Sequence, residues 1–466
     1  MLQSDSGLPH ASEQDGVSKR PHGPSTADRR RRSMKVAIIH DWLVVRGGAE
    51  QVLAEMLAMF PEADLYTTVC FLPSDQREFL QGRSPRTTFI QRLPRAASKY
   101  RSYFPLMPLA IEQFDFSAYD VVISSSYCAA KGIITGPNQV HISYVHSSAR
   151  WAWDMQAGYL KQVGLERGLK SVIARLMLHY FRLWDTRTAH GVDHYVANSR
   201  FVAARIRKTY GRNAAVVHPP VDVAQFAFAD KKEDFYLTAS RLVPYKRIPL
   251  IVEAFAAMPT KRLVVIGDGP DMAAVRALGA PNVTVLGYQS TEVLVDHMQR
   301  AKAFLFAAEE DFGIVPLEAQ ACGTPVIAYG RGGALETVIG DESAGEERTG
   351  VFFFEQTSQA IASAVEEFET AAADISAAAC RKNAMRFTRE QFRKRLQTEI
   401  DAAMATYDQD LATARRRPSG AITEVDPRSN PLEIGQDPRR RTPGGRQAPD
   451  DRGGGLAAVV PQPAEG

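Results

Sequence analysis

The chain has 466 residues, of which 45% are hydrophobic and 23% charged, and its formal net charge is +3. At about 100 to 200 residues per domain, this length predicts two to three domains with sizeable cores. The composition excludes a small disulfide-rich scaffold and a wholly disordered chain. The sequence contains no run of about 18 apolar residues and no apolar signal segment at its Arg-rich start, so we predict a cytoplasmic protein without a membrane span.

Cysteine spacing and charge exclude two further classes of protein. The four cysteines are scattered and lack any Cys-x-x-Cys or Cys/His spacing, which predicts reduced thiols and no structural zinc. Basic and acidic residues are nearly equal in number between residues 34 and 404. A nucleic-acid binder needs an excess of Lys and Arg to neutralise phosphates, so no nucleic-acid partner is predicted.

The two ends of the chain differ from its middle. Residues 1–33 and 405–466 contain few large apolar side chains and are rich in Pro, Gly, Ser or Arg, so both are expected to be disordered extensions. Between them, short β-branched strands alternate with amphipathic helices. This alternation is typical of α/β domains with parallel sheets. We expect an N-terminal half, 34–222, and a C-terminal half, 223–404, that ends in a closing helix.

The N-terminal half begins with a strand, a glycine loop and a helix. The loop contains Gly47 and Gly48, and the helix is expected from about Ala49 to Met59. The strands of this half are expected at Val36–His40, Val121–Ser124, His141–Val145, His194–Ala197 and Val216–Val217.

The C-terminal half repeats the pattern of strand, turn and helix. Its strands are expected at Phe235–Ser240, Arg262–Gly267, Val283–Gly287, Ala303–Ala307 and Pro325–Tyr329. In open α/β sheets ligands bind beyond the carboxyl ends of the strands. Two such Rossmann-like domains are therefore predicted to face a ligand in an interdomain cleft.

Two carboxylates stand out in the C-terminal half. Glu310 lies in the loop after a strand and Glu318 lies on the helix that follows. Eight residues are about two helical turns, so the pair lies at most about 12 Å apart along one side. This separation suits two parts of an extended ligand rather than a carboxylate pair that shares a proton. Between them Gly313 lets a ligand approach the backbone, and N–H groups at the helix start, at Ile314 and Val315, favour an anion such as a diphosphate.

Further turns in this half carry candidate ligand groups. Arg241 and Lys246 follow one strand, and a guanidinium and an ammonium together suit a departing nucleoside diphosphate. Surface charge is the alternative interpretation of these two residues. The turns with Gly267 and Gly269, and with Gly287 and Tyr288, would permit close contact with a ligand. A glycine turn alone is weak evidence, but four strand ends in one half that carry these turns and the charged residues make a stronger case.

These segments resemble the retaining glycosyltransferases of family 4, also called group 1, which have the GT-B fold. The matching segments are SRLVPYKR (240–247), VVIGDGP (264–270), VTVLGY (283–288) and EEDFGIVPLEAQACGTPVIAYGRGGALETV (309–338). The resemblance implies that Arg241 and Lys246 hold the donor diphosphate. It also implies that Glu310 binds the hydroxyls of the donor sugar, that Glu318 binds the ribose, and that the turn at 287–288 lies near the base. Such enzymes use no metal and no cofactor besides the nucleotide sugar.

The N-terminal half narrows the resemblance. The segment HDWLVVRGGAEQVL (40–53) looks like the first-strand loop of the family, which implies that Gly47 and Gly48 lie near the donor phosphates or the acceptor; a plain tight turn is the alternative. The segment SYVHSSARWAWD (143–154) is similar to one in bacterial mannosyltransferases of lipid-linked oligosaccharide and exopolysaccharide synthesis. This similarity implies that His146 lies beside the reacting sugar.

A basic and aromatic stretch covers residues 83–111. It contains six Lys and Arg residues and no acidic residue. Such a stretch can lie on an anionic membrane surface and receive a polyprenyl-linked acceptor, which predicts peripheral attachment to the inner face of the cell membrane. A solvated basic face is the alternative.

The expected function is metal-independent, retaining transfer of a hexose, mannose from GDP-mannose, to a polyprenyl-diphosphate-linked oligosaccharide or similar glycan. Two alternatives stay open. One is a UDP-hexose-dependent transferase on the same fold, and the other is a non-catalytic sugar-nucleotide-binding assembly subunit. A nicotinamide dehydrogenase is disfavoured, because no Gly-x-Gly-x-x-Gly opens either sheet.

Overall fold

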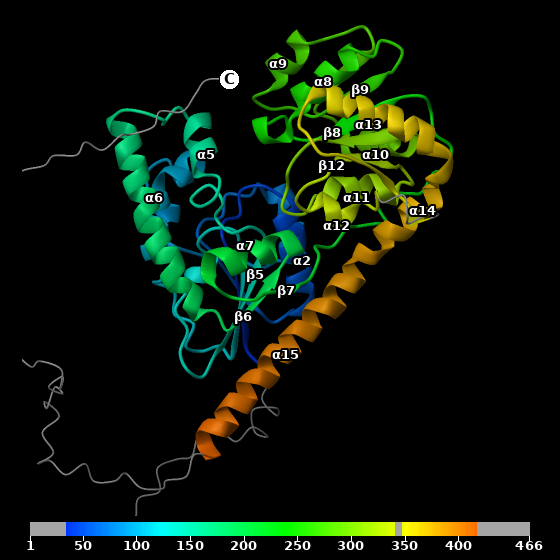
Figure 1. Ribbon diagram of the computed structural model, residues 1–466. Helices are drawn as coiled ribbons and strands as arrows, with labels where there is room; N and C mark the ends of the chain where they lie inside the picture. Colours follow the sequence, from blue (N-terminus) through cyan, green and yellow to red (C-terminus); the bar gives the residue numbers. More distant parts are fainter. Residues whose placement is uncertain (1–33, 341–346, 417–466) are drawn as a thin grey trace, which may run out of the picture. The chain divides into compact units, whose positions relative to one another are not determined.

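The computed structural model describes residues 34–340 and 347–416 (Figure 1). The predicted extension 1–33 lies outside the described residues, as does the part of the predicted tail from residue 417 onward.

The N-terminal half contains a seven-stranded parallel sheet with the order β3-β2-β1-β4-β5-β6-β7. Every residue of β1, β4 and β5 is buried, as expected for parallel strands that are covered on both faces. The strands are β1 (Val36–His40), β2 (Asp64–Thr67), β3 (Arg86–Thr87), β4 (Val121–Ser126), β5 (Val140–Val145), β6 (His194–Ala197) and β7 (Ala215–Val216).

The C-terminal half contains a six-stranded parallel sheet with the order β10-β9-β8-β11-β12-β13. Its strands are β8 (Tyr236–Ala239), β9 (Leu263–Ile266), β10 (Val283–Gly287), β11 (Ala303–Phe306), β12 (Val326–Tyr329) and β13 (Gly350–Phe353). The strands expected from the sequence are confirmed to within two residues at their ends. The prediction did not include β2, β3 and β13.

Strand order fixes where a ligand can bind. In each sheet the chain first builds outward from a central strand on one side, and then continues on the other side of that strand. The switch falls between β1 and β4 in one sheet and between β8 and β11 in the other. At such a switch point the two outgoing loops diverge and leave a crevice at the carboxyl ends of the strands. The loops after β1, β8 and β11 are those that carry Gly47, Lys246 and Glu310.

Helices connect the strands of both sheets. They are α2 (Gly48–Met59), α3 (Ala96–Lys99), α4 (Met107–Ile111), α5 (Gln156–Gln162), α6 (Leu169–Thr188), α7 (Arg200–Tyr210), α8 (Ile248–Ala256), α9 (Met272–Ala277), α10 (Thr291–Arg300), α11 (Ile314–Ala321), α12 (Ala334–Thr337), α13 (Ser358–Ala371), α14 (Ala377–Ala384) and α15 (Arg389–Arg416), together with short 3₁₀ segments such as η4 (Tyr100–Leu106). No helix among the described residues is long and apolar enough to cross a membrane.

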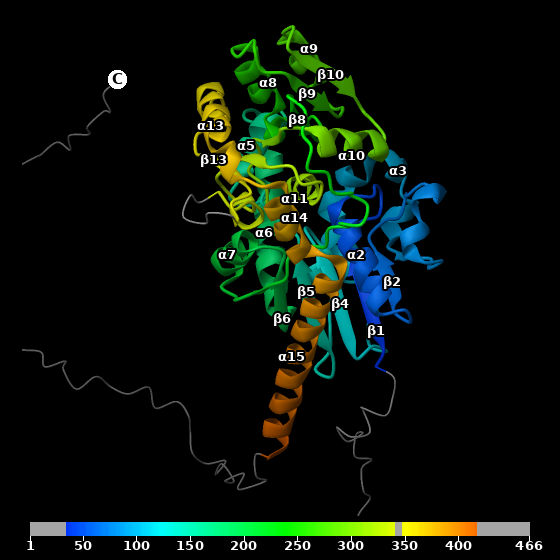
Figure 2. The same cartoon turned by 90° about the vertical axis from the view of Figure 1, so that its right-hand side faces the viewer.

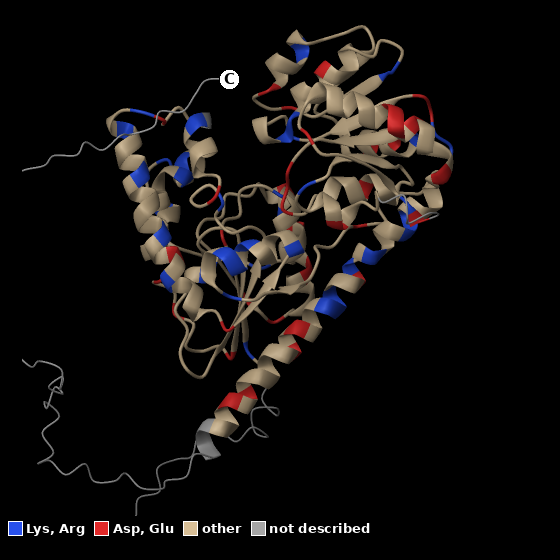
Figure 3. Ribbon diagram, viewed as in Figure 1, with Lys and Arg blue, Asp and Glu red and all other residues tan. Residues whose placement is uncertain are grey.

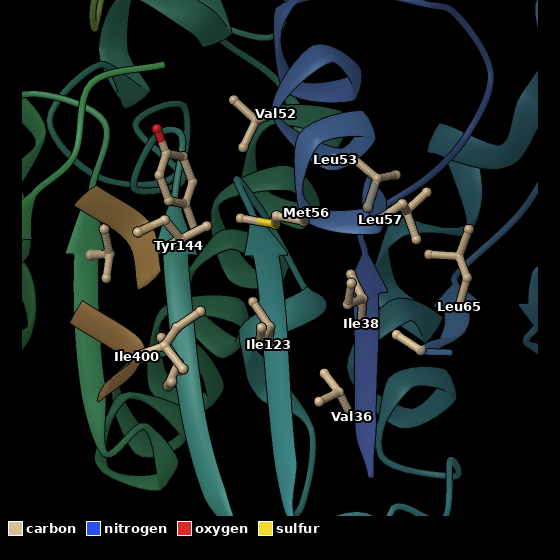
Figure 4. Close-up of a cluster of buried hydrophobic side chains, with 14 of the residues drawn as sticks. Val36, Ile38, Val52, Leu53, Met56, Leu57, Leu65, Ile123, Tyr144 and Ile400 are labelled. Atoms are coloured by element: carbon tan, nitrogen blue, oxygen red, sulfur yellow. The ribbon is translucent and has the colours of Figure 1, made fainter. Parts of the chain in front are cut away.

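The core of the N-terminal half includes a helix from the far end of the chain. Helix α2 contributes Val52, Leu53 and Met56 to this core, which they share with β-strand residues such as Ile123 (Figure 4). Phe392, Leu396 and Ile400 of α15 belong to the same buried cluster.

The observed course of α15 corrects two predictions. We expected the closing helix to belong to the C-terminal half, but its apolar face packs into the core of the N-terminal half (Figure 1, Figure 2). We also expected the tail to begin at residue 405, whereas α15 continues to Arg416. The described residues up to Leu411 form one compact unit.

Candidate functional site

A pocket of about 340 Å³ gathers residues from both halves of the chain. We call it the Lys246 pocket. The N-terminal half contributes loops after β1, β5, β6 and β7, and the C-terminal half contributes loops after β8 and β11. The lining residues are Gly48, Ala49, His146, Arg150, Asn198, Pro219, Tyr245, Lys246, Glu310, Asp311, Phe312, Gly313, Ile314 and Val315.

Lys246 and Glu310 form an ion pair within the pocket. Their side chains are only 12% and 17% exposed. The two residues meet because β8 and β11 are neighbours, so the loops that follow these strands leave the same edge of the sheet. The main chain of Glu310 is held in turn, because its carbonyl accepts the N–H of Gly333 at 2.8 Å. The ammonium that was predicted to hold phosphate is therefore paired with the carboxylate that was predicted to hold sugar.

The start of α11 forms another part of the pocket. Gly313 precedes the helix with φ +87°, a conformation that favours glycine. Ile314 and Val315, in the first turn, line the pocket, and N–H groups of a first helical turn have no partner within the helix. Gly48 lies close to this turn, since a Cβ on Gly48 would come within 2.7 Å of the Cδ1 of Ile314. The glycine loop and the helix start are thus brought together.

His146 is the end of a hydrogen-bonded chain of side chains. Its Nε2 lies 2.8 Å from the Oγ of Ser125, and the same oxygen lies 2.9 Å from the Nδ1 of His40. His40 Nε2 in turn lies 3.4 Å from Glu50, whose other carboxylate oxygen accepts the N–H of Gly47 at 2.8 Å. A hydroxyl has one proton, so one of the two rings donates to Ser125 and the other accepts from it. The chain links the predicted glycine loop to the predicted histidine.

Burial controls the protonation of His146 and Glu318. Burial, together with the nearby His40, holds the pKa of His146 well below its ordinary value, so the ring is neutral at neutral pH. Burial raises the pKa of Glu318 to about 7, and the charge of Lys246 opposes that rise. Glu318 is thus a candidate hydrogen-bonding group whose charge changes near neutral pH.

The sequence prediction missed Arg150 and Asp311. Arg150 lies in the segment 143–154, and its Nη1 is buried without a hydrogen-bond partner, 3.5 Å from a carboxylate oxygen of Asp311. Asp311 also pairs with Arg205 of α7. A buried guanidinium nitrogen without a partner can bind an anionic ligand, because such a ligand would relieve its unsatisfied hydrogen bond. Only the position of Arg150 four residues after His146 could have indicated this role.

Other predicted site residues lie outside the pocket. Arg241 is exposed and is not among the described residues that line it. Gly267 and Gly269 have a packing role, because a Cβ at either position would come within 2.5 Å of a main-chain carbonyl oxygen, 1.8 Å from Ser240 or 2.4 Å from Leu242. Gly287 has φ +72° with open space beside it, and Tyr288 is 82% exposed. Glycine in these turns therefore does not by itself indicate donor contact.

The basic residues of the stretch 83–111 differ in their surroundings. Arg83 donates to main-chain carbonyls of Phe60 and Pro61, and Arg86 donates to the hydroxyl of Tyr66. These two arginines hold local structure. The side chains of Arg92, Arg95, Lys99 and Arg101 are exposed. Contact of this stretch with a membrane stays a prediction.

Within residues 34–340 and 347–416, no group of three or more His, Cys, Asp or Glu residues is arranged so that it could hold a metal ion. The sequence-based expectation that the reaction needs neither a metal nor a cofactor stays a prediction.

Two family models match adjoining parts of the chain. The model described as Glycosyltransferase Family 4 matches residues 46–225, and the model described as Glycosyl transferases group 1 matches residues 223–387. Together they contain every residue that lines the Lys246 pocket. The chain belongs to the group 1 and family 4 glycosyltransferases.

Curated relatives match shorter stretches. A GDP-mannose-dependent monoacylated alpha-(1-6)-phosphatidylinositol monomannoside mannosyltransferase from Corynebacterium glutamicum is 31% identical over 219 residues, which is 40% of this chain and 58% of the relative. A D-inositol 3-phosphate glycosyltransferase from Mycobacteroides abscessus is 31% identical over 179 residues, 33% of this chain and 40% of the relative. Each alignment covers less than two thirds of the relative.

Solved structures match most of the chain. Anabaena Alr3699/HepE in complex with UDP is 16% identical with a TM-score of 0.55, and the match covers 79% of this chain and 100% of that protein. Sucrose-phosphate synthase from Thermosynechococcus elongatus is 18% identical with a TM-score of 0.59, and the match covers 80% of this chain and 100% of that protein. With the two parallel sheets, these likenesses confirm the predicted GT-B fold.

Proposed function

We propose that the chain transfers a hexose from a nucleotide sugar to a glycan acceptor, with retention of anomeric configuration and without a metal. Mannose from GDP-mannose is the proposed donor, and a polyprenyl-diphosphate-linked oligosaccharide or similar glycan is the proposed acceptor. One observation carries the proposal. The Lys246 pocket joins an ammonium, a carboxylate, a neutral histidine and a helix start from two Rossmann-like sheets.

Each group has a role in this proposal. The donor diphosphate replaces Glu310 as the partner of Lys246 and accepts hydrogen bonds from the start of α11. The freed Glu310 carboxylate then binds hydroxyls of the sugar. Arg150, which comes from the N-terminal half, adds a second cation to the pocket. The positive charge stabilises the diphosphate as the bond to C1 of the sugar breaks.

The acceptor completes the step. Its hydroxyl oxygen forms the new bond to C1 on the face that the diphosphate leaves, and its proton passes to the departing diphosphate oxygen. Neutral His146 lies beside the sugar and can donate or accept one hydrogen bond without adding charge. Retention is carried over from the family resemblance.

The choice of donor is supported by the curated relatives. The Corynebacterium glutamicum protein and a relative from Mycolicibacterium smegmatis, 30% identical over 194 residues, are both named as GDP-mannose-dependent mannosyltransferases. The Anabaena structure instead contains UDP. A UDP-hexose-dependent transferase is therefore the second candidate.

Two measurements on the full chain separate the candidates. Calorimetric titration with GDP-mannose, UDP-glucose and UDP-galactose measures donor binding, and hydrolysis assays of the same donors, with and without EDTA, measure turnover and its dependence on metal. We expect binding and slow hydrolysis of GDP-mannose, unchanged by EDTA. Hydrolysis of a UDP-sugar alone would favour the second candidate. Donor binding without hydrolysis or transfer to any glycan would favour a non-catalytic subunit, and loss of turnover in EDTA would contradict metal independence.

A further inference from the structure

A second cavity, of about 480 Å³, lies in the N-terminal half between η4, α5 and α6. We call it the aromatic cavity. Its walls include Trp42, Phe104, Tyr127, Trp151 and Met177, and Arg101 is the one charged residue among the described residues that line it. The volume lies in the range of pockets that bind small organic ligands. An apolar wall with one cation suits an amphiphile that has a hydrocarbon chain and an anionic head.

The walls of this cavity are held in place without a ligand. Asp41, fully buried, accepts the main-chain N–H groups of Tyr127 and Cys128 at 2.6 and 2.8 Å and those of the next two residues at similar distances. Two further lining residues also contact each other, since the ring centroids of Phe104 and Trp151 lie 4.8 Å apart in an edge contact. The side chains that line such a cavity lack the dispersion contacts that close packing would give them. A hydrocarbon chain bound in the cavity would supply these contacts.

The aromatic cavity lies next to the Lys246 pocket. The ring of Tyr127 packs against Trp42 with centroids 4.9 Å apart, and also against His146 with centroids 6.1 Å apart. Trp42 and Tyr127 line the aromatic cavity, whereas His146 lines the Lys246 pocket. One aromatic ring therefore separates the space for a hydrocarbon chain from the predicted position of the reacting sugar.

Apolar surface continues outward from the aromatic cavity along α6. Met177, which lines the cavity, is 44% exposed. Beside it on the helix, Leu169, Ile173, Leu176, Tyr180 and Leu183 are between 45% and 75% exposed. Lys and Arg residues also lie on α6 (Figure 3). A chain longer than the cavity could leave it over this apolar and basic surface.

We propose that the aromatic cavity binds the first part of the hydrocarbon chain of the acceptor, with Arg101 beside the phosphate group that is bonded to that chain. The occupant is an isoprenoid or comparable chain that carries an anionic phosphate head. This inference deepens the proposed function and rests on it, because it assigns a place to the lipid part of the proposed acceptor.

Binding of farnesyl monophosphate to the full chain tests the proposal, by calorimetry below the concentration at which the probe forms micelles. Farnesol and inorganic phosphate are the comparison probes. We expect farnesyl monophosphate to bind and inorganic phosphate not to bind measurably. Farnesol should bind about tenfold more weakly than farnesyl monophosphate, because it lacks one hydrogen bond to a charged group. Phosphate that binds as tightly as the farnesyl probe would overturn the proposal.

Two pairs of variants locate the site. Ala174→Phe adds a ring to the cavity wall, whereas Ala157→Phe adds one to an exposed position of α5 outside the lining. We expect only the first to weaken farnesyl binding, by at least about tenfold, because the added ring excludes methylene groups of the chain from the cavity and their burial contributes to binding. Arg101→Gln is expected to bring farnesyl monophosphate to the affinity of farnesol, and Arg92→Gln, at an exposed arginine of the same stretch, is not.

Two outcomes would overturn the assignment. One is equal farnesyl affinity in Ala174→Phe and the wild type, and the other is an equal loss of farnesyl monophosphate affinity in Arg101→Gln and Arg92→Gln. If Ala174→Phe does not fold, as judged by its melting temperature, Met177→Trp fills the same wall from a half-exposed position and is held to the same criterion. Because the probes contain no nucleotide, a chain that binds farnesyl monophosphate but no nucleotide sugar would contradict the proposed function and not the lipid site.

Discussion

Lys246 is held by a carboxylate that the donor must displace. Lys246→Ala removes the cation that faces the departing diphosphate, and we expect turnover to fall about 100- to 1000-fold, as for the loss of one contact to transition-state charge. The remaining Glu310 would be a partly buried carboxylate without its Lys246 partner. We therefore also expect the free energy of unfolding to fall, by about 1–3 kcal/mol.

Donor hydrolysis and thermal unfolding measure the two effects. Lys382→Ala is the matched control, because Lys382 pairs with Glu347 at an exposed position, 75% and 64% accessible, and lies outside the Lys246 pocket. Equal turnover in the two variants would contradict the assigned role of Lys246.

Glu318 makes stability depend on pH. Its pKa is about 7 in the folded chain against an ordinary value of 4.5 for a Glu carboxyl, so between these pH values the folded state keeps a proton that the unfolded state has released. The free energy of unfolding should therefore fall as pH rises from 4.5 to 7, by at most about 3 kcal/mol from this group.

Denaturant unfolding of the wild type and Glu318→Gln at pH 5 and pH 8 tests this expectation. The glutamine variant cannot ionise, so it should lose less stability on going to pH 8 than the wild type does. It should also bind donor more weakly, because an amide offers one acceptor oxygen where a carboxylate offers two. Parallel pH dependence in both proteins would show that Glu318 does not titrate in this range.

The sequence predicted single site residues correctly where they belong to a motif that directly follows a strand. Glu310 and Lys246 stand after strands in segments that the family shares, and their loops do meet. Arg150 and Asp311 meet only because α/β halves far apart in sequence approach each other. Asp311 gave no separate signal, since it appeared only as part of the loop between the two glutamates. At Gly267 and Gly269 the neighbouring main chain leaves no room for a Cβ, and their contact with the donor stays a prediction.

At the scale of elements, hydrophobic patterning indicated the buried strands and did not indicate the partner of the last helix. Short edge strands such as β3, with two residues, carry too little pattern to be recognised. The apolar positions Phe392, Leu396 and Ile400 of α15 predict an amphipathic helix. Their spacing does not say which sheet the helix covers, because both halves offer apolar surfaces of the same kind.

Leu396→Ala tests the observed position of α15. Leu396 is 0% exposed within the core cluster of the N-terminal half, so truncation should cost about 2–5 kcal/mol. Hydrogen exchange should increase first in β4 and β5. Lys394→Ala, at an exposed position of the same helix, should change stability by less than about 0.5 kcal/mol. Faster exchange in β8 and β11 alone would assign the helix to the other half.

For the molecule as a whole, ion pairs across the two halves are the feature that the sequence could not predict. Besides the contacts of Asp311, Glu336 of α12 accepts the Nε2 proton of His218 at 2.9 Å and main-chain N–H groups at the start of α7. Burial raises the pKa of Glu336, but these hydrogen bonds outweigh it and the pKa is lowered. Such contacts join the two halves of the chain near the Lys246 pocket.

A double-mutant cycle on Arg205 and Asp311 measures how strongly the halves are joined. The two side chains are 13% and 14% exposed, so their charges are poorly screened, and we expect a coupling free energy of about 1–3 kcal/mol between Arg205→Gln and Asp311→Asn. The exposed pair Lys382 and Glu347, in a parallel cycle, should give less than about 1 kcal/mol. Added salt should weaken the second coupling more than the first, since exposed charges are screened more. If the coupling of Arg205 and Asp311 is no larger than that of the exposed pair, the halves are held by apolar contacts such as Ile314 against Gly48, and the pocket does not depend on Asp311.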